Sequence, residues 1–148
     1  TNSGSDQGQM SPMVEQLEER YGRRAEAWLV DGGFAGLAEI ERVSQAGSTV
    51  YAPVMEPRDP TRDRHEPRPR DAPEVAAWRQ RMGTEEAKTI YKERAATSEC
   101  VNAQSRNRGL QQFPVRGVSK GTAIVLWYAL AHNVMRTAAL LGLGAGIT

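Results

Sequence analysis

The chain has 148 residues, of which 39% are hydrophobic and 25% are charged, and its formal net charge is +1. This length and balance predict one globular domain and argue against a fibrous or wholly disordered chain. The single cysteine, Cys100, excludes an internal disulfide and a cysteine-rich metal site, so a reducing cytoplasm is the expected location.

The small net charge hides an uneven distribution of charged residues along the chain. Residues 1–73 contain 13 acids and 9 lysines or arginines, whereas residues 74–148 contain 5 acids and 10 lysines or arginines. A basic half favours a polyanion such as nucleic acid as a partner. A solvated helix face with surplus lysines and arginines is the alternative.

A helix is expected near the start of the chain. After the polar segment 1–10, apolar residues recur with helical spacing at Met13, Leu17 and Tyr21. Pro12 occupies a position typical of the first helical residue, where its missing N–H group costs nothing. The sequence therefore predicts a helix that starts at this proline.

The next segment predicts a strand, a helix and a second strand. The apolar run 27–30 predicts a buried strand with Asp31 at its carboxyl end. Residues 37–45 predict a short helix closed by Gly47, and residues 49–54 predict the second strand. A helix between two strands favours parallel pairing of those strands.

The segment 56–73 differs in composition from its surroundings, because it contains five prolines, five arginines and five acids. Such a segment cannot bury a core, so a loop or flexible insertion is expected. Its arginines are candidates for contact with a DNA backbone. A balanced, solvated linker is the interpretation that the equal numbers of opposite charges favour.

The last third of the chain is predicted to be helical. Thr84 is a helix-capping residue, and it opens a predicted helix over 84–108 that ends before Gly109. A strongly apolar helix is expected over 119–141. Its uncharged stretch, 121–135, is shorter than the roughly 20 apolar residues that cross a bilayer, so we expect a buried core helix and no membrane contact.

Two carboxylates are candidates for chemistry. Asp31 lies between an apolar strand and a glycine pair, where a ligand can approach the backbone, although an Asp that caps a turn is the alternative. Glu99 falls between Lys92 and Arg106 at spacings of seven, on one helix face, with Asn102 beside it. A carboxylate flanked by cations suits a metal-bound phosphodiester, and ordinary charge alternation on an exposed helix is the alternative. No side chain is placed as a nucleophile.

Two motifs resemble those of bacterial insertion-sequence DDE transposases. The segment 29–34 (LVDGGF) resembles the A-D-x-G-[YF] block, in which an apolar strand carries the second catalytic Asp. Tyr91, Arg94, Glu99 and Arg106 follow one another like the Tyr-Arg-Glu-Lys signature around the third acid. The segments at 2–12, 107–109, 116–117 and 131–133 also resemble blocks of this family in the same order.

The chain departs from the family pattern at three points. Four residues separate Arg94 from Glu99 where three are usual, and Arg106 replaces the final Lys. The family's first catalytic Asp lies on an earlier strand, and Asp6, in a polar segment, does not have that context. We therefore expect this chain to be the C-terminal part of a catalytic domain, inactive by itself.

The resemblance implies an α/β fold of the RNase H-like (retroviral-integrase-like) type, truncated at its N-terminal strands. It implies that Asp31 and Glu99 are catalytic ligands for Mg²⁺ or Mn²⁺ in a transposase that cuts and joins DNA and works as a homo-oligomer. The residues implied to contact DNA or support the site are Tyr91, Lys92, Arg94, Asn102, Arg106 and Arg108. A non-catalytic DNA-binding or dimerising remnant and an unrelated two-metal nuclease are the alternatives.

Overall fold

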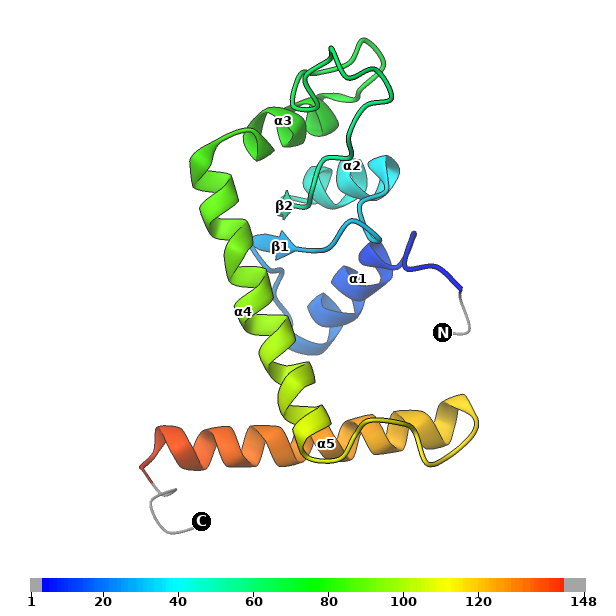
Figure 1. The fold of residues 1–148 in the computed structure, drawn as a ribbon, viewed down its shortest axis with the longest axis vertical. Helices are drawn as coiled ribbons and strands as arrows, with labels where there is room; N and C mark the ends of the chain where they lie inside the picture. The colour runs from blue at the N-terminus through cyan, green and yellow to red at the C-terminus, as the bar shows by residue number, and fades with distance from the viewer. Residues whose placement is uncertain (1–3, 143–148) are drawn as a thin grey trace. The chain divides into compact units, whose positions relative to one another are not determined.

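The computed structural model describes residues 4–142, apart from the side chains of residues 96–102. The chain divides into two compact units, one formed by residues 3–94 and one that contains residues 95–142. The elements in order are α1 (Met10–Tyr21), β1 (Ala27–Leu29), α2 (Leu37–Gln45), β2 (Thr49–Tyr51), α3 (Pro73–Met82), α4 (Glu85–Asn107) and α5 (Val118–Leu140) (Figure 1).

The two strands form a parallel pair, as the order strand, helix, strand predicts. Ala27 pairs with Thr49, and the backbone N–H of Val30 donates to Tyr51 O at 3.0 Å just beyond the end of β1. Both strands are shorter than expected. The second stops before Pro53, which has no N–H group to donate to a neighbouring strand. A mixed α/β architecture is thereby confirmed, while an RNase H-like arrangement stays a prediction.

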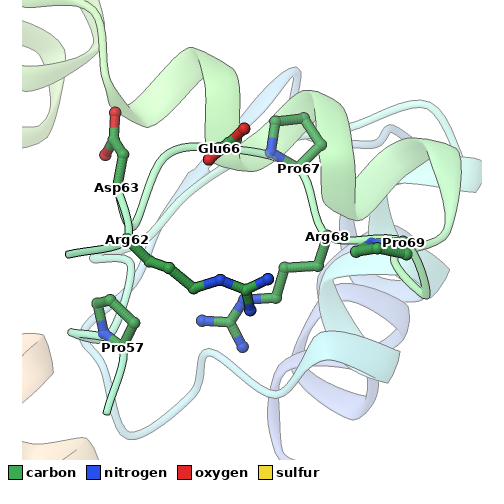
Figure 2. Close-up of a pocket in the computed structure, with 7 residues that line it drawn as sticks. All are labelled: Pro57, Arg62, Asp63, Glu66, Pro67, Arg68 and Pro69. Atoms are coloured by element: carbon green, nitrogen blue, oxygen red, sulfur yellow. The ribbon is translucent and has the colours of Figure 1, made fainter. Parts of the chain in front are cut away.

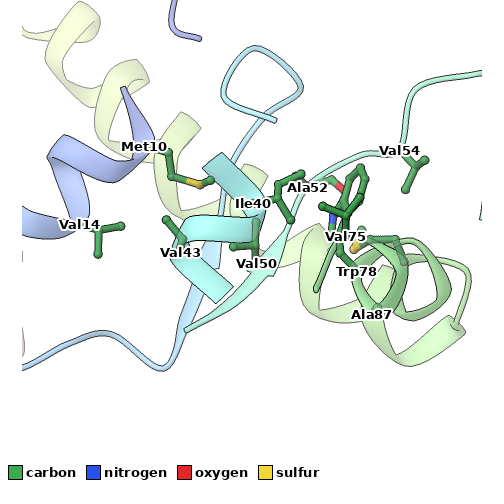
Figure 3. Close-up of a cluster of buried hydrophobic side chains, with 11 residues drawn as sticks. Met10, Val14, Ile40, Val43, Val50, Ala52, Val54, Val75, Trp78 and Ala87 are labelled. Carbon is green, nitrogen blue, oxygen red and sulfur yellow. The ribbon is translucent and has the colours of Figure 1, made fainter. Parts of the chain in front are cut away.

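The hydrophobic core of the first unit lies where α2, β2 and α3 meet (Figure 3). Ile40 of α2 and Val50 of β2 have no exposed surface, and Trp78 of α3 is 2% exposed. The indole N–H of Trp78 donates to Ala52 O at 3.2 Å, so the largest buried side chain of α3 also satisfies its polar atom. This core fixes the two strands and the loop that follows β2.

Helix α1 begins at Met10, two residues earlier than predicted. Pro12 is therefore the third helical residue, where its missing N–H still breaks no hydrogen bond within the helix. The backbone N–H of Ser11 donates to Glu39 Oε2 at 2.7 Å, which links the first turn of α1 to α2. This contact spans 28 residues, so local spacing could not have predicted where the helix starts.

Helix α4 has the ends that the sequence predicts. Thr84 Oγ1 accepts a hydrogen bond from the N–H of Ala87 at 3.2 Å, which confirms Thr84 as the capping residue. The helix ends two residues before Gly109, whose φ of 98° lies in the left-handed region that favours glycine.

The expected burial of the C-terminal helix is wrong. The structure describes α5 in full and none of its residues is buried; Trp127, for example, is 71% exposed. In its own unit the Tyr128 hydroxyl donates to Arg108 O at 3.2 Å, beyond the end of α4. The second unit is small and offers α5 too little surface to cover an apolar helix on several sides. Among the described residues no helix has the length and apolar character needed to span a bilayer.

Candidate catalytic site

Asp31 lies in the turn that follows β1 and is half-buried. Its Oδ1 atom accepts a hydrogen bond from the N–H of Gly33 at 3.0 Å, and its carbonyl oxygen accepts one from Phe34 N at 3.2 Å. The turn-capping role is therefore real. Among the residues that the structure describes, the Oδ2 atom has no hydrogen-bond partner, so the turn orients one carboxylate oxygen and leaves the other without a hydrogen bond.

The sequence did not reveal that a second carboxylate lies beside Asp31. A β-carbon on Gly33 would lie 3.2 Å from Asp31 Oδ1 and 3.5 Å from Asp6 Oδ2. The side chains of Asp6 and Asp31 therefore lie next to the same small space, which exists because residue 33 has no side chain. Asp6 is on a loop and not on a strand, so the structure agrees with the sequence that it lacks the context of the family's first Asp.

The turn after β1 lies against the chain that leaves β2. A β-carbon on Gly32 would lie 3.5 Å from Pro53 Cγ. Because β1 and β2 are parallel, their carboxyl ends share one edge of the sheet, and ligands of open α/β sheets bind at that edge. Asp31 is thus at the edge where a catalytic ligand is expected.

Three of the proposed site-supporting residues lie on the part of α4 that belongs to the first unit. Tyr91 is half-buried against the core, and the guanidinium carbon of Arg94 lies 5.6 Å from the centre of its ring. A cation at this distance is attracted by the face of the ring. Arg94 is therefore in favourable contact with Tyr91, whereas Lys92 is exposed to solvent.

The other proposed residues lie farther along the chain. Glu99 and Asn102 are on α4, and their side chains lie outside the described residues. Arg106 and Arg108 are exposed in the second unit. Among the described residues no three His, Cys, Asp or Glu side chains are grouped so that they could hold a metal ion. A pocket shared by Asp31 and Glu99 therefore stays a prediction.

A family model described as a transposase DDE domain matches residues 57–138. The match covers more than half of the chain, and the chain belongs to this transposase family. It is thereby a domain of a DNA-binding, nucleotidyl-transfer enzyme family whose members generally use a divalent metal. The matched residues include the Tyr91 to Arg106 motif, whereas Asp31 precedes them. Searches of curated proteins and of solved structures found no match.

Proposed function

We propose that this chain supplies the second and third acids of an insertion-sequence transposase that cleaves DNA and joins the cut end to a target. The observation that carries the proposal is the family match over residues 57–138, which include α4. The order of Tyr91, Arg94, Glu99 and Arg106 in the sequence supports it, because it resembles the Tyr-Arg-Glu-Lys signature. The contact between Arg94 and Tyr91 also supports it, because it brings two of the signature residues together. For the whole domain we propose an RNase H-like fold.

The two acids suit a hard divalent cation. Asp31 and Glu99 offer carboxylate oxygens, the ligands that Mg²⁺ and Mn²⁺ prefer. When bound, the metal supplies a Lewis acid and lowers the pKa of an attacking hydroxyl. The chain itself orients Asp31 through the Gly33 N–H and presents Arg94 and Arg106 to the phosphates of DNA. Lys92, Asn102 and Arg108 lie on or just after the same helix and are proposed to extend this contact.

The decisive test compares the acids in the complete transposase. Glu99→Gln and Asp31→Asn should each lower strand cleavage by at least about 100-fold. Replacing a residue that merely hydrogen-bonds to a metal ligand can already cost this much, and these two residues are proposed to be the ligands themselves. Glu86→Gln, an exposed acid in the first turn of the same helix, is the matched control and keeps full cleavage. DNA binding, measured by gel shift without metal, stays within a few-fold of wild type in all three. Cleavage by Glu99→Gln at the wild-type rate would remove Glu99 from the mechanism.

The same assay separates the alternatives, because joining and cutting are scored separately. Cutting without joining identifies a two-metal nuclease, and DNA binding with neither reaction identifies a non-catalytic remnant. Two acids cannot replace a three-acid site, so we propose that residues 1–148 alone bind DNA without cutting it.

We further propose that the working transposase is a homo-oligomer located in the bacterial cytoplasm. Two DNA ends have to be held together before they are joined, and one protomer for each end is the simplest arrangement. Light scattering after size-exclusion chromatography should then give more than one protomer per complex on end-containing DNA. One protomer per complex would contradict this proposal.

A further inference from the structure

The loop between β2 and α3 contains a pocket that the catalytic site does not use. Residues of the segment 57–69 line a half-open cavity of about 180 Å³, well above the roughly 10–15 Å³ of such volume that holds one water molecule. Figure 2 shows Arg62 and Arg68 extending into this space from the two limbs of the loop. Its other lining residues are Pro57, Asp63, Glu66, Pro67 and Pro69.

The acids of this loop are mostly engaged within the loop or with α3. Asp59 Oδ1 accepts hydrogen bonds from the N–H and the hydroxyl of Thr61, at 3.0 and 2.6 Å. Asp63 Oδ1 accepts one from His65 N at 2.9 Å. Asp71 accepts hydrogen bonds from Arg68 N and from the Arg79 side chain.

The arginines of the loop are mostly not paired. Arg64 forms an ion pair with Glu56 at 2.7 Å. Within the described part of the chain, the guanidinium groups of Arg62 and Arg68 have neither a hydrogen bond nor an ion pair, although both lie near acids of the loop. Most acids of the segment are engaged with backbone N–H groups or with Arg64 and Arg79. The guanidinium groups of Arg62 and Arg68 therefore remain available although the segment is neutral overall. The segment is balanced in charge and mostly exposed, as the sequence predicts, and the structure adds that two of its arginines line one pocket.

The loop is also held in shape before any ligand binds. Asp71 forms a 2.7 Å ion pair with Arg79 of α3, and both side chains are nearly inaccessible to solvent. The ring nitrogen Nδ1 of His65 lies 3.3 Å from Arg79 O, and a β-carbon on Gly83 would lie 3.1 Å from His65 Cβ. Prolines restrict the backbone between these anchors. Binding an anion here would therefore order little additional chain.

We propose that Arg62 and Arg68 together bind one phosphate of the DNA backbone, away from the metal ligands. Both side chains are exposed and extend into one pocket, and each guanidinium group matches the oxygens of a phosphate bidentately. Asp63 and Glu66 line the same pocket and offset part of this positive charge. The pocket follows β2, so the loop starts from the same sheet edge as Asp31. This inference rests on the proposed function only in taking DNA as the source of the phosphate.

The test measures DNA affinity of the complete transposase without metal, so that no cleavage occurs. The probe is a fluorescein-labelled duplex carrying an end of the element, and anisotropy gives the dissociation constant at several salt concentrations. Arg62→Ala/Arg68→Ala should weaken binding by roughly 10- to 100-fold, because charge-assisted hydrogen bonds are lost. The slope of log affinity against log salt should fall by about 0.9, the value for one phosphate.

Two comparisons separate this site from general charge attraction. Arg58→Ala/Arg70→Ala removes the same charge from the same loop outside the pocket, and it should change affinity by only a few-fold. Since Arg62 and Arg68 share one phosphate, each single variant should lose most of the affinity that the double variant loses. Arg62→Lys/Arg68→Lys keeps the charge without the bidentate geometry and should give an intermediate loss.

Three outcomes would overturn the inference. Equal losses in the two double-alanine variants would mean diffuse attraction, and wild-type affinity in Arg62→Ala/Arg68→Ala would mean that no DNA phosphate is bound. Binding of inorganic phosphate that requires both arginines, with DNA affinity unchanged, would assign the pocket to a free anion. If wild-type protein cuts and joins DNA while the arginine variants bind normally, this inference fails and the proposed function stands. If wild-type protein does not bind DNA, both fail.

Discussion

Removing Asp71 should destabilise the protein far more than breaking an exposed ion pair of the same length. The Asp71 and Arg79 side chains are 5% and 4% exposed, and their closest atoms are 2.7 Å apart. Asp71→Ala leaves the Arg79 guanidinium buried without its counter-charge. Breaking a buried ion pair in this way costs about 3–5 kcal/mol, which is a large part of the roughly 5–15 kcal/mol free energy of unfolding of a typical domain.

The chain contains its own comparison for this prediction. Lys88 and Glu85 on α4 are also 2.7 Å apart, but their side chains are 46% and 89% exposed. Lys88→Ala should therefore change the free energy of unfolding by less than about 1 kcal/mol. Urea titrations of the full chain, followed by circular dichroism, give both values by linear extrapolation.

A double variant tests whether the two buried charges depend on each other. Asp71→Ala/Arg79→Met removes both, so it should be considerably more stable than Asp71→Ala alone. If Asp71→Ala costs no more than Lys88→Ala, solvent screens the Asp71–Arg79 pair. The loop is then not anchored as the structure indicates.

Two further predictions concern pH and the space beside Asp31. Burial raises the pKa of Asp71, but hydrogen bonds from Arg79 and from the Arg68 N–H outweigh it and hold this pKa below its usual range. The stabilisation by the Asp71 carboxylate is therefore complete above its pKa in the unfolded state, about 3.9, and is lost as pH falls through its lower pKa in the folded state. The difference in unfolding free energy between wild type and Asp71→Ala should therefore shrink in acid. A difference independent of pH would contradict this. Gly33→Ala places a methyl group 3.2 Å from Asp31 Oδ1, which then has to shift by a few tenths of an ångström. A displacement of 1 Å in a catalytic site costs about 100-fold in rate, so this smaller shift should lower cleavage by the complete transposase roughly 10-fold. Gly4 has open space around it, so the control Gly4→Ala should leave cleavage unchanged.

The sequence predicted the ends of those helices that are set by capping residues and glycines close to them in the chain. The helix at Leu37–Gln45 has the predicted bounds, and Gly47 after it has a φ of 96°, as its closing role requires. Thr84 and Gly109 mark the ends of α4 for the same reason. Parallel pairing of β1 and β2 followed from the helix between them.

Contacts between distant residues explain what the sequence missed. The start of α1 depends on Glu39, and Asp6 lies beside Gly33 only once α1 and β1 are folded. Composition counted the charges of the loop before α3 but could not say that its acids bind the backbone. The motif at 29–34 did place Asp31 at a strand end, while its convergence with Glu99 stays a prediction.

The three tryptophans lie in three different environments, so intrinsic tryptophan fluorescence can report when the protein binds a partner. Trp78 is 2% exposed, Trp28 on β1 is partly buried, and Trp127 on α5 is 71% exposed. A water-soluble quencher should therefore reduce emission from Trp127 first and emission from Trp78 last. Anything that covers α5 should shift the emission towards the blue and slow this quenching, with no label attached. Quenching of the buried Trp78 would indicate that the first unit has unfolded, which distinguishes unfolding from a change at α5.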